Sequence, residues 1–189
     1  DFLNRYKMRK QVAIIGGGPS GLLLAKLLKQ SDIDCIVLEK HTKEHVLSRV
    51  RAGVLEEGSV QLLEKAGVSE RLKREGFKHN GIFLSSKNAS FRINFKELVD
   101  KCVTVYGQTE ATADLYDAVE KDGIIVNSAS HVMPEDITEK NSTVSFSHKN
   151  QIHKISCDFV IGCDGFHGVS RQQIPKDYSR VFERIYPFG

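Results

Sequence analysis

The glycine-rich segment Gly16-Gly17-Gly18-Pro19-Ser20-Gly21 constrains the fold of this chain more than any other feature. It follows a β-branched run at residues 12–15 and opens residues 22–28, where six of seven positions are apolar. A second apolar run, residues 33–38, ends at the acidic residue Glu39. Strand, helix and strand within about thirty residues predict a βαβ unit with parallel, buried strands and a buried helix.

The spacing of the glycines predicts a dinucleotide site. Gly16 allows a tight turn, Gly18 lets the backbone approach a pyrophosphate, and Gly21 lets the helix lie close to the strand. The helix N-terminus, which includes Ser20, offers free N–H groups and a partial positive charge. Glu39 is placed to accept hydrogen bonds from ribose hydroxyls, which favours FAD or NAD over a directly bound NADP. The alternative is a glycine-rich turn that binds nothing.

Composition and charge exclude several classes of protein. The chain has 27 basic and 24 acidic residues, and residues 1–10 alone account for the net charge of +3. The remainder is balanced, so we expect no nucleic-acid partner. No apolar run is long enough for a membrane span, and we find no secretory leader. We interpret residues 1–7 as an extension or expression remnant before a natural start at Met8.

The cysteines predict neither disulfides nor a metal site. No pair has the C-x-x-C spacing and no histidine lies at a zinc-ligand distance from them in sequence; they are Cys35, Cys102, Cys157 and Cys163. We therefore expect reduced thiols in a cytoplasmic protein, and no metal.

Apolar periodicity along the rest of the chain predicts an α/β fold. Helices are expected over residues 55–66, 69–75 and 108–120. Strands are expected over residues 82–84, 91–95, 102–106, 124–126, 144–146, 152–155 and 159–163. In the first helix, Leu55, Leu62, Leu63 and Ala66 share one side. Residues 181–189 provide no closing element, so we interpret the chain as cut from a longer one.

Five stretches carry a more specific resemblance. They read QVAIIGGGPSGLLL (11–24), RVRAGVLE (49–56), VTVYGQTE (103–110), IGCDGFHGVSR (161–171) and VFERIYPFG (181–189). With these motifs the chain resembles the para-hydroxybenzoate hydroxylases, FAD-dependent aromatic monooxygenases of roughly twice this length. The resemblance implies a Rossmann-like FAD-binding domain with a parallel sheet, a βαβ start and a β-meander over residues 8–80 and 100–180. Residues 81–99 and 181–189 would then belong to an incomplete substrate-domain sheet.

The resemblance also implies roles for individual residues. Gly16, Gly18, Ser20, Gly21 and Glu39 match the FAD site. Arg49 and Arg51 match a pair that contacts FAD and the nicotinamide cofactor, and Gln108 matches an FAD contact. Asp164-Gly165 matches a fingerprint that serves both cofactors, and His167 and Arg171 match NADPH contacts. His79 matches the solvent end of a proton relay. The plainer alternatives are a solvated arginine patch, a helix cap, a strand-end turn and a structural histidine.

The implied activity is hydroxylation of 4-hydroxybenzoate to 3,4-dihydroxybenzoate with FAD, NADPH and O2, by a cytoplasmic homodimer. Lys40, His41 and His45 stand where NADPH-preferring members carry Arg, Gln and Tyr. Lys40 keeps a cation, so NADPH is expected and NADH stays open. Two other hypotheses stay open: a different phenolic substrate, and a nucleotide-binding fragment that is inactive alone.

Overall fold

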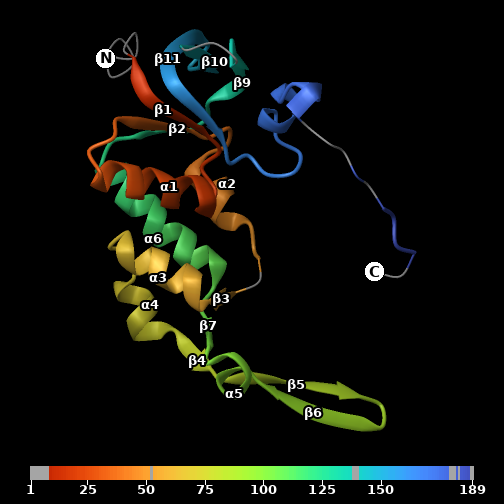
Figure 1. Cartoon of the computed structure of the whole chain (residues 1–189). Helices are drawn as coiled ribbons and strands as arrows, with labels where there is room; N and C mark the ends of the chain where they lie inside the picture. The colour runs from red at the N-terminus through yellow and green to blue at the C-terminus, as the bar shows by residue number, and fades with distance from the viewer. Residues whose placement is uncertain (1–8, 52, 138–140, 179–181, 183, 188–189) are drawn as a thin grey trace.

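The computed structural model describes residues 9–51, 53–137, 141–178, 182 and 184–187, and its largest sheet has the strand order β8-β2-β1-β11-β10-β9 (Figure 1). Strands β8, β2, β1 and β11 pair in parallel, and β10 and β9 continue the sheet antiparallel. The strands are β1 (Lys10–Ile15), β2 (Cys35–Leu38), β8 (Ile125–Val126), β9 (Ser130–Glu135), β10 (Ser142–His148) and β11 (Gln151–Gly162). The predicted βαβ start, parallel strands and meander are therefore confirmed.

Apolar residues bury both faces of the parallel strands. Successive strand residues point to opposite faces, so a continuous apolar run fills two cores. One core packs under helices α1 (Pro19–Gln30) and α6 (Gln108–Lys121) and contains Val12, Ile14, Cys35, Val37, Leu22 and Leu115. The other contains Ala13, Ile15, Ile36, Leu38, Val144, Phe146 and Ile155, from the parallel strands and the meander.

A smaller three-stranded antiparallel sheet lies beyond the helices, in the order β3-β7-β4. Beside this sheet, the hairpin β5–β6 extends away from the rest of the structure, at the end opposite the meander (Figure 1). These strands are β3 (Val54–Glu56), β4 (Phe77–His79), β5 (Gly81–Ser86), β6 (Ala89–Asn94) and β7 (Val103–Val105). The remaining helices are α2 (Lys43–Ser48), α3 (Glu57–Lys65), α4 (Glu70–Glu75), α5 (Phe95–Val99) and the short 3-10 helices η2 (Ser170–Gln173) and η3 (Lys176–Tyr178).

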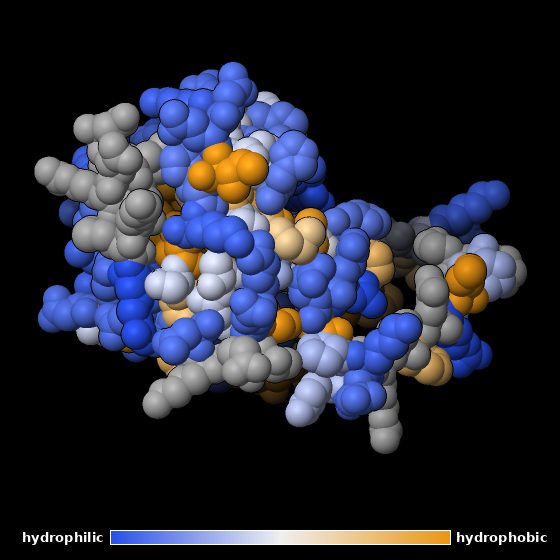
Figure 2. All heavy atoms as spheres, turned by 90° about the horizontal axis from the view of Figure 1, so that it is seen from above, coloured by the Kyte–Doolittle hydropathy of each residue, from blue (hydrophilic) through white to orange (hydrophobic). Residues whose placement is uncertain are grey.

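Viewed from the meander end, the surface is mostly hydrophilic with scattered hydrophobic groups (Figure 2). The exposed apolar side chains of the meander strands include Met133, Ile152 and Phe159. Isolated apolar residues of this kind are ordinary on a protein surface. No helix in the described ranges is long and apolar enough to cross a membrane.

Three sequence predictions about elements are wrong in detail. The helix expected over residues 55–66 begins at Glu57, because Leu55 pairs with Thr104 in β3, and Leu62 is 44% exposed. The strands expected at 152–155 and 159–163 form one strand, β11. The strand expected from residue 33 begins at Cys35, because the Ile33 N–H donates to the Leu28 carbonyl in the turn that ends α1.

Other helices and strands also differ from the sequence predictions. Helix α1 is longer than expected and only partly buried, with Gly21, Leu22 and Ala25 on its buried side. The patterns did not predict α2, α5, β4 or β9. The interpretation of residues 1–7 lies outside the described residues, as does much of that of residues 181–189.

Candidate functional site

The glycine loop joins the end of β1 to the start of α1, and packing requires two of its glycines. Gly16 has a φ of +109°, and a Cβ there would lie 2.5 Å from the Cys163 carbonyl oxygen. A Cβ on Gly21 would overlap the Gly16 carbonyl oxygen and approach the Cys163 side chain. Helix α1 therefore lies against the ends of β1 and β11 at a distance that only glycine permits.

Gly18 is different, because nothing lies within 4 Å of the position that its Cβ would take. It is the N-cap of α1, and no side chain in the described residues caps this end by a hydrogen bond. The first turn contains no acidic residue. A helix N-terminus with open space beside it suits an anion such as a pyrophosphate, whose approach a Cβ would block.

The carboxylate of Glu39 lies directly beside this loop. Glu39 is 7% exposed, at the end of β2. Its Oε2 accepts the Gly17 N–H at 2.6 Å, and its Oε1 accepts the His41 N–H at 2.7 Å. Each carboxylate oxygen can accept more than one hydrogen bond, so acceptor capacity remains for a hydroxyl group. The structure thus brings Glu39 to the glycine loop, and Gly17 supplies an N–H donor that sequence reasoning missed.

A second loop follows β11 and lies next to the first. The Cys163 N–H donates to the Ile15 carbonyl at 2.7 Å, which joins the ends of β11 and β1. The Asp164 Oδ2 accepts the Ser170 N–H at 3.0 Å and the Ser170 hydroxyl at 3.1 Å. Gly165, with a φ of +77°, accepts the Gly168 N–H. Asp164-Gly165 is therefore a strand-end turn whose carboxylate holds the loop that leads to Arg171.

The loop after β11 lines a hollow of about 1150 Å³ together with Ser20 at the start of α1 and with residues of β9, β11 and η2. Its lining includes Ser20, Cys163, Asp164, Gly165, Ser170 and Arg171. Four predicted site residues, Ser20, Asp164, Gly165 and Arg171, therefore meet at one place. Burial raises the pKa of the Cys163 thiol here, and the Ser20 hydroxyl lies 3.9 Å from its sulfur.

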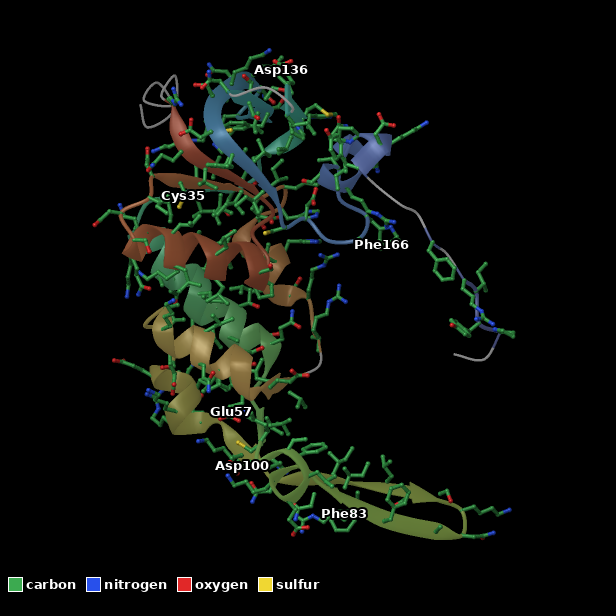
Figure 3. The ribbon with its side chains drawn as sticks, viewed as in Figure 1. Cys35, Glu57, Phe83, Asp100, Asp136 and Phe166 are labelled. Atoms are coloured by element: carbon green, nitrogen blue, oxygen red, sulfur yellow. The ribbon has the colours of Figure 1, made fainter. Side chains whose placement is uncertain are left out.

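Phe166 is a residue of this loop that sequence reasoning missed. Its ring is 72% exposed and projects from the loop after β11 (Figure 3). The Arg171 guanidinium lies 4.5 Å from its centroid, and the His167 ring meets it edge-on at 5.0 Å. The sequence signal that could have identified it is an aromatic residue directly after Asp-Gly. Phe166, His167 and Arg171 form an aromatic and basic surface at the edge of the hollow.

Residues 40–51 place further basic groups beyond Glu39. Lys40, Arg49 and Arg51 are exposed, and in the described part of the chain neither arginine forms an ion pair. The rings of His41 and His45 stack at 4.0 Å. Burial, followed by the proximity of His45, lowers the pKa of His41. Lys40 and the two arginines could receive a phosphate.

Gln108 and His79 lie farther from the glycine loop. Gln108 begins α6 and is half-buried, next to Gly107. A Cβ on Gly53 would lie 2.8 Å from the Gly107 Cα, so the segment that carries Arg51 runs close to Gln108. His79 is exposed on β4, beyond the helices (Figure 1). The structure does not bring His79 to the glycine loop.

The four cysteines are free thiols. Across the described ranges, no three His, Cys, Asp or Glu side chains form a group that could hold a metal ion.

The sequence matches the family described as FAD binding domain over residues 9–189. The p-hydroxybenzoate hydroxylase of Acinetobacter baylyi is 43% identical over 183 residues, which cover 96% of this chain and 45% of that protein. The 3-amino-4-hydroxybenzoate 2-monooxygenase of Streptomyces cremeus is 28% identical and covers 90% and 43%. The chain thus spans a little under half the length of these curated relatives.

Solved structures share the fold at low sequence identity. PqsL of P. aeruginosa in complex with 2-aminobenzoylacetate has a TM-score of 0.76 at 16% identity, covering 95% of this chain and 49% of that one. The p-nitrophenol 4-monooxygenase PnpA of Pseudomonas putida has a TM-score of 0.74 at 18% identity, covering 88% and 43%. The predicted Rossmann-like α/β fold is confirmed.

Proposed function

Because the chain belongs to the FAD-binding domain family, we propose that it is the flavin-binding part of a longer aromatic monooxygenase. That protein would convert 4-hydroxybenzoate, O2, NADPH and a proton into 3,4-dihydroxybenzoate, NADP+ and water. The observation that carries the proposal is the glycine loop, where the space beside Gly18, the start of α1 and the Glu39 carboxylate lie together. This loop stands in a chain 43% identical to a p-hydroxybenzoate hydroxylase.

The glycine loop would hold the ADP half of FAD. The first-turn N–H groups of α1, including that of Ser20, would receive the pyrophosphate beside Gly18. Glu39 would accept hydrogen bonds from the ribose hydroxyls, while the Gly17 and His41 N–H groups keep its carboxylate in place. When bound, FAD supplies the redox and oxygen chemistry that amino-acid side chains lack.

Arg49, Arg51 and Gln108 would contact the cofactors farther along. The guanidinium groups are exposed and suit phosphate oxygens, because each presents a planar fork of N–H donors. Gln108 would contact FAD from the start of α6. The contact between Gly53 and Gly107 supports a shared role, because it draws the two segments together.

NADPH would bind on the side of the hollow lined by Asp164, Gly165 and Arg171. The cationic Arg171 and the neighbouring His167 would meet its phosphates, and Phe166 would offer an aromatic face. Asp164 would act by holding this loop through Ser170. Lys40 would favour NADPH over NADH.

We assign residues 8–80 and 100–180 to the FAD-binding domain, and residues 81–99 and 181–189 to a substrate domain. The separate β5–β6 sheet supports the first boundary. His79, next to this boundary, would stand at the solvent end of a proton relay to the phenol. We further propose that the longer protein is a cytoplasmic homodimer. The four free thiols of the present chain suit a reducing compartment.

A different phenolic substrate is the second candidate, because the 28% identical relative acts on 3-amino-4-hydroxybenzoate. Two experiments separate the possibilities. Titration of the purified chain with FAD tests the nucleotide site, and absence of binding contradicts it. Product analysis of the longer protein with a panel of hydroxybenzoates, under NADPH and NADH, tests the activity; no product from the para isomer contradicts the proposed substrate. Hydroxylation by the 189-residue chain alone would contradict its role as only a part.

A further inference from the structure

A partly buried polar network joins Tyr106 to helices α4 and α6. The Tyr106 side chain is 5% exposed, and its hydroxyl donates to the Asp114 Oδ2 at 2.6 Å. The same hydroxyl accepts the Arg71 Nε–H at 2.8 Å, and this nitrogen lies 3.0 Å from the Asp114 Oδ1. Arg71 also donates from Nη2 to the Glu110 carbonyl at 2.7 Å. Burial, and then the Asp114 carboxylate, raises the pKa of Tyr106, so its hydroxyl keeps its proton.

The backbone of Tyr106 ties this network to two segments with predicted cofactor contacts. Its N–H donates to the Gly53 carbonyl at 2.8 Å, which continues the pairing of β3 with β7. Gly53 lies two residues after Arg51, and Tyr106 lies two residues before Gln108. The close approach of Gly53 to Gly107 leaves little room for one segment to move without the other.

The same network contacts the first turn of α6. Its N-cap, Gly107, offers no side chain to close the helix end. Arg71 reaches across from α4 and donates to the Glu110 carbonyl in the first turn, which ties α6 to α4 at this end.

We propose that Tyr106, fixed by Arg71 and Asp114, is a positioning residue that holds Arg51 and Gln108 in register for the flavin nucleotide. This inference rests on the proposed function, because it takes FAD as the ligand of these two residues. Tyr106 itself touches neither the glycine loop nor Glu39 by any hydrogen bond in the described part of the chain.

The variant Tyr106→Phe tests the proposal, because it keeps the ring and removes only the hydroxyl. FAD and AMP are titrated separately, since AMP reaches only the adenosine side of the site. We expect the Kd for FAD to rise about tenfold, as for a lost buried hydrogen bond, and the Kd for AMP to stay within about twofold. Equal weakening of both ligands, or no change in either, would overturn the proposal.

Tyr116→Phe is the matched control. Tyr116 is also a buried tyrosine whose hydroxyl donates to a side chain, that of Asn127, but among the described residues it forms no hydrogen bond to Gly53 or Arg51. Removal of the Tyr116 hydroxyl should change the Kd for FAD and the Kd for AMP by the same factor. If Tyr116→Phe raises the FAD to AMP ratio as much as Tyr106→Phe does, the specific role of Tyr106 is wrong.

A ligand-free readout separates this inference from the proposed function. Arg49 and Arg51 are exposed trypsin sites in the segment that Gly53 anchors. Tyr106→Phe should increase the rate of cleavage after these arginines about tenfold over that of the unaltered chain, while cleavage elsewhere stays unchanged. If the unaltered chain binds no FAD, the proposed function of this chain fails, and the cleavage rates still decide whether Tyr106 holds the segment. Unchanged cleavage would overturn the positioning role.

Discussion

At the scale of single residues, Gly18 and Gly21 lie three positions apart but respond oppositely to a methyl group. The Gly18→Ala Cβ enters open space where the pyrophosphate is proposed to lie, so we expect folding to be unaffected and the Kd for FAD to rise by more than tenfold. The Gly21→Ala Cβ overlaps the Gly16 carbonyl oxygen, so we expect a loss of about 2 kcal/mol or more in unfolding free energy. Chemical denaturation and FAD titration of both variants check this pair. Unchanged FAD binding by Gly18→Ala would argue against the site.

Cys35 gives the chain a defined dependence of stability on pH. Burial, and then Asp34, raises the pKa of this thiol from 9.0 to about 11. The unfolded thiol therefore ionises first, and stability present below pH 9 is lost as the pH rises to 11. The loss from this group is about 2 kcal/mol. Denaturant titrations between pH 8 and pH 11 should show a smaller decline for Cys35→Ala than for the unaltered chain; equal declines would contradict the assignment.

The sequence predicts the role of a residue well when that role depends on residues nearby in the chain. Gly16 and Gly21 follow from the sterics of one strand–turn–helix unit, and the structure places both as that unit requires. Phe166 and Ser170 were missed because their contacts form only when the loop after β11 folds back on itself. The predicted roles of Arg49, Arg51 and His79 stay predictions, since they concern ligands.

At the scale of elements, helices α3 and α6 test how far periodicity determines burial. Leu115 in α6 is 1% exposed and belongs to the core under α1, so Leu115→Ala should cost about 2–5 kcal/mol of unfolding free energy. Leu62 in α3 was expected on the buried side but is 44% exposed, so Leu62→Ala should cost less than about 1 kcal/mol. Urea denaturation of both variants measures the difference. Equal losses of unfolding free energy in the two variants would contradict the exposed position of Leu62 on α3.

The errors at this scale have physical causes. Leu55 continues the helical apolar period, but its pairing with Thr104 places it in a strand. Strand β11 reads as two strands because it changes partner along its length, from β10 at residues 151–157 to β1 at residues 157–162. Strand β9 has a left-handed residue, His131, and a proline, Pro134, which hide its pattern. Neighbours distant in sequence decide the first two cases, and residues within the strand decide the third.

At the scale of the whole molecule, the β5–β6 hairpin is the part least connected to the cores. It forms a sheet of its own and extends away from the helices, with Phe83 far from Asp136 at the meander end (Figure 3). Cross-strand pairing places Ile82 opposite Ile93 and Leu84 opposite Phe91 on one face. The other face carries Phe83 opposite Arg92 and a hydrogen-bonded serine pair. The hairpin is therefore amphipathic although little covers its apolar face.

This apolar face predicts concentration-dependent self-association of the 189-residue chain. Contiguous exposed apolar side chains on a hairpin with open edges favour pairing between molecules. The double variant Leu84→Thr, Phe91→Thr introduces β-branched residues that suit a strand and makes the face more polar, so we expect weaker association and a melting temperature within about 2 °C of the unaltered chain. Phe83→Thr, on the opposite face, is the matched control and should still associate. Sedimentation velocity over a hundredfold concentration range distinguishes these outcomes, and association that all three proteins share equally would place the contact elsewhere.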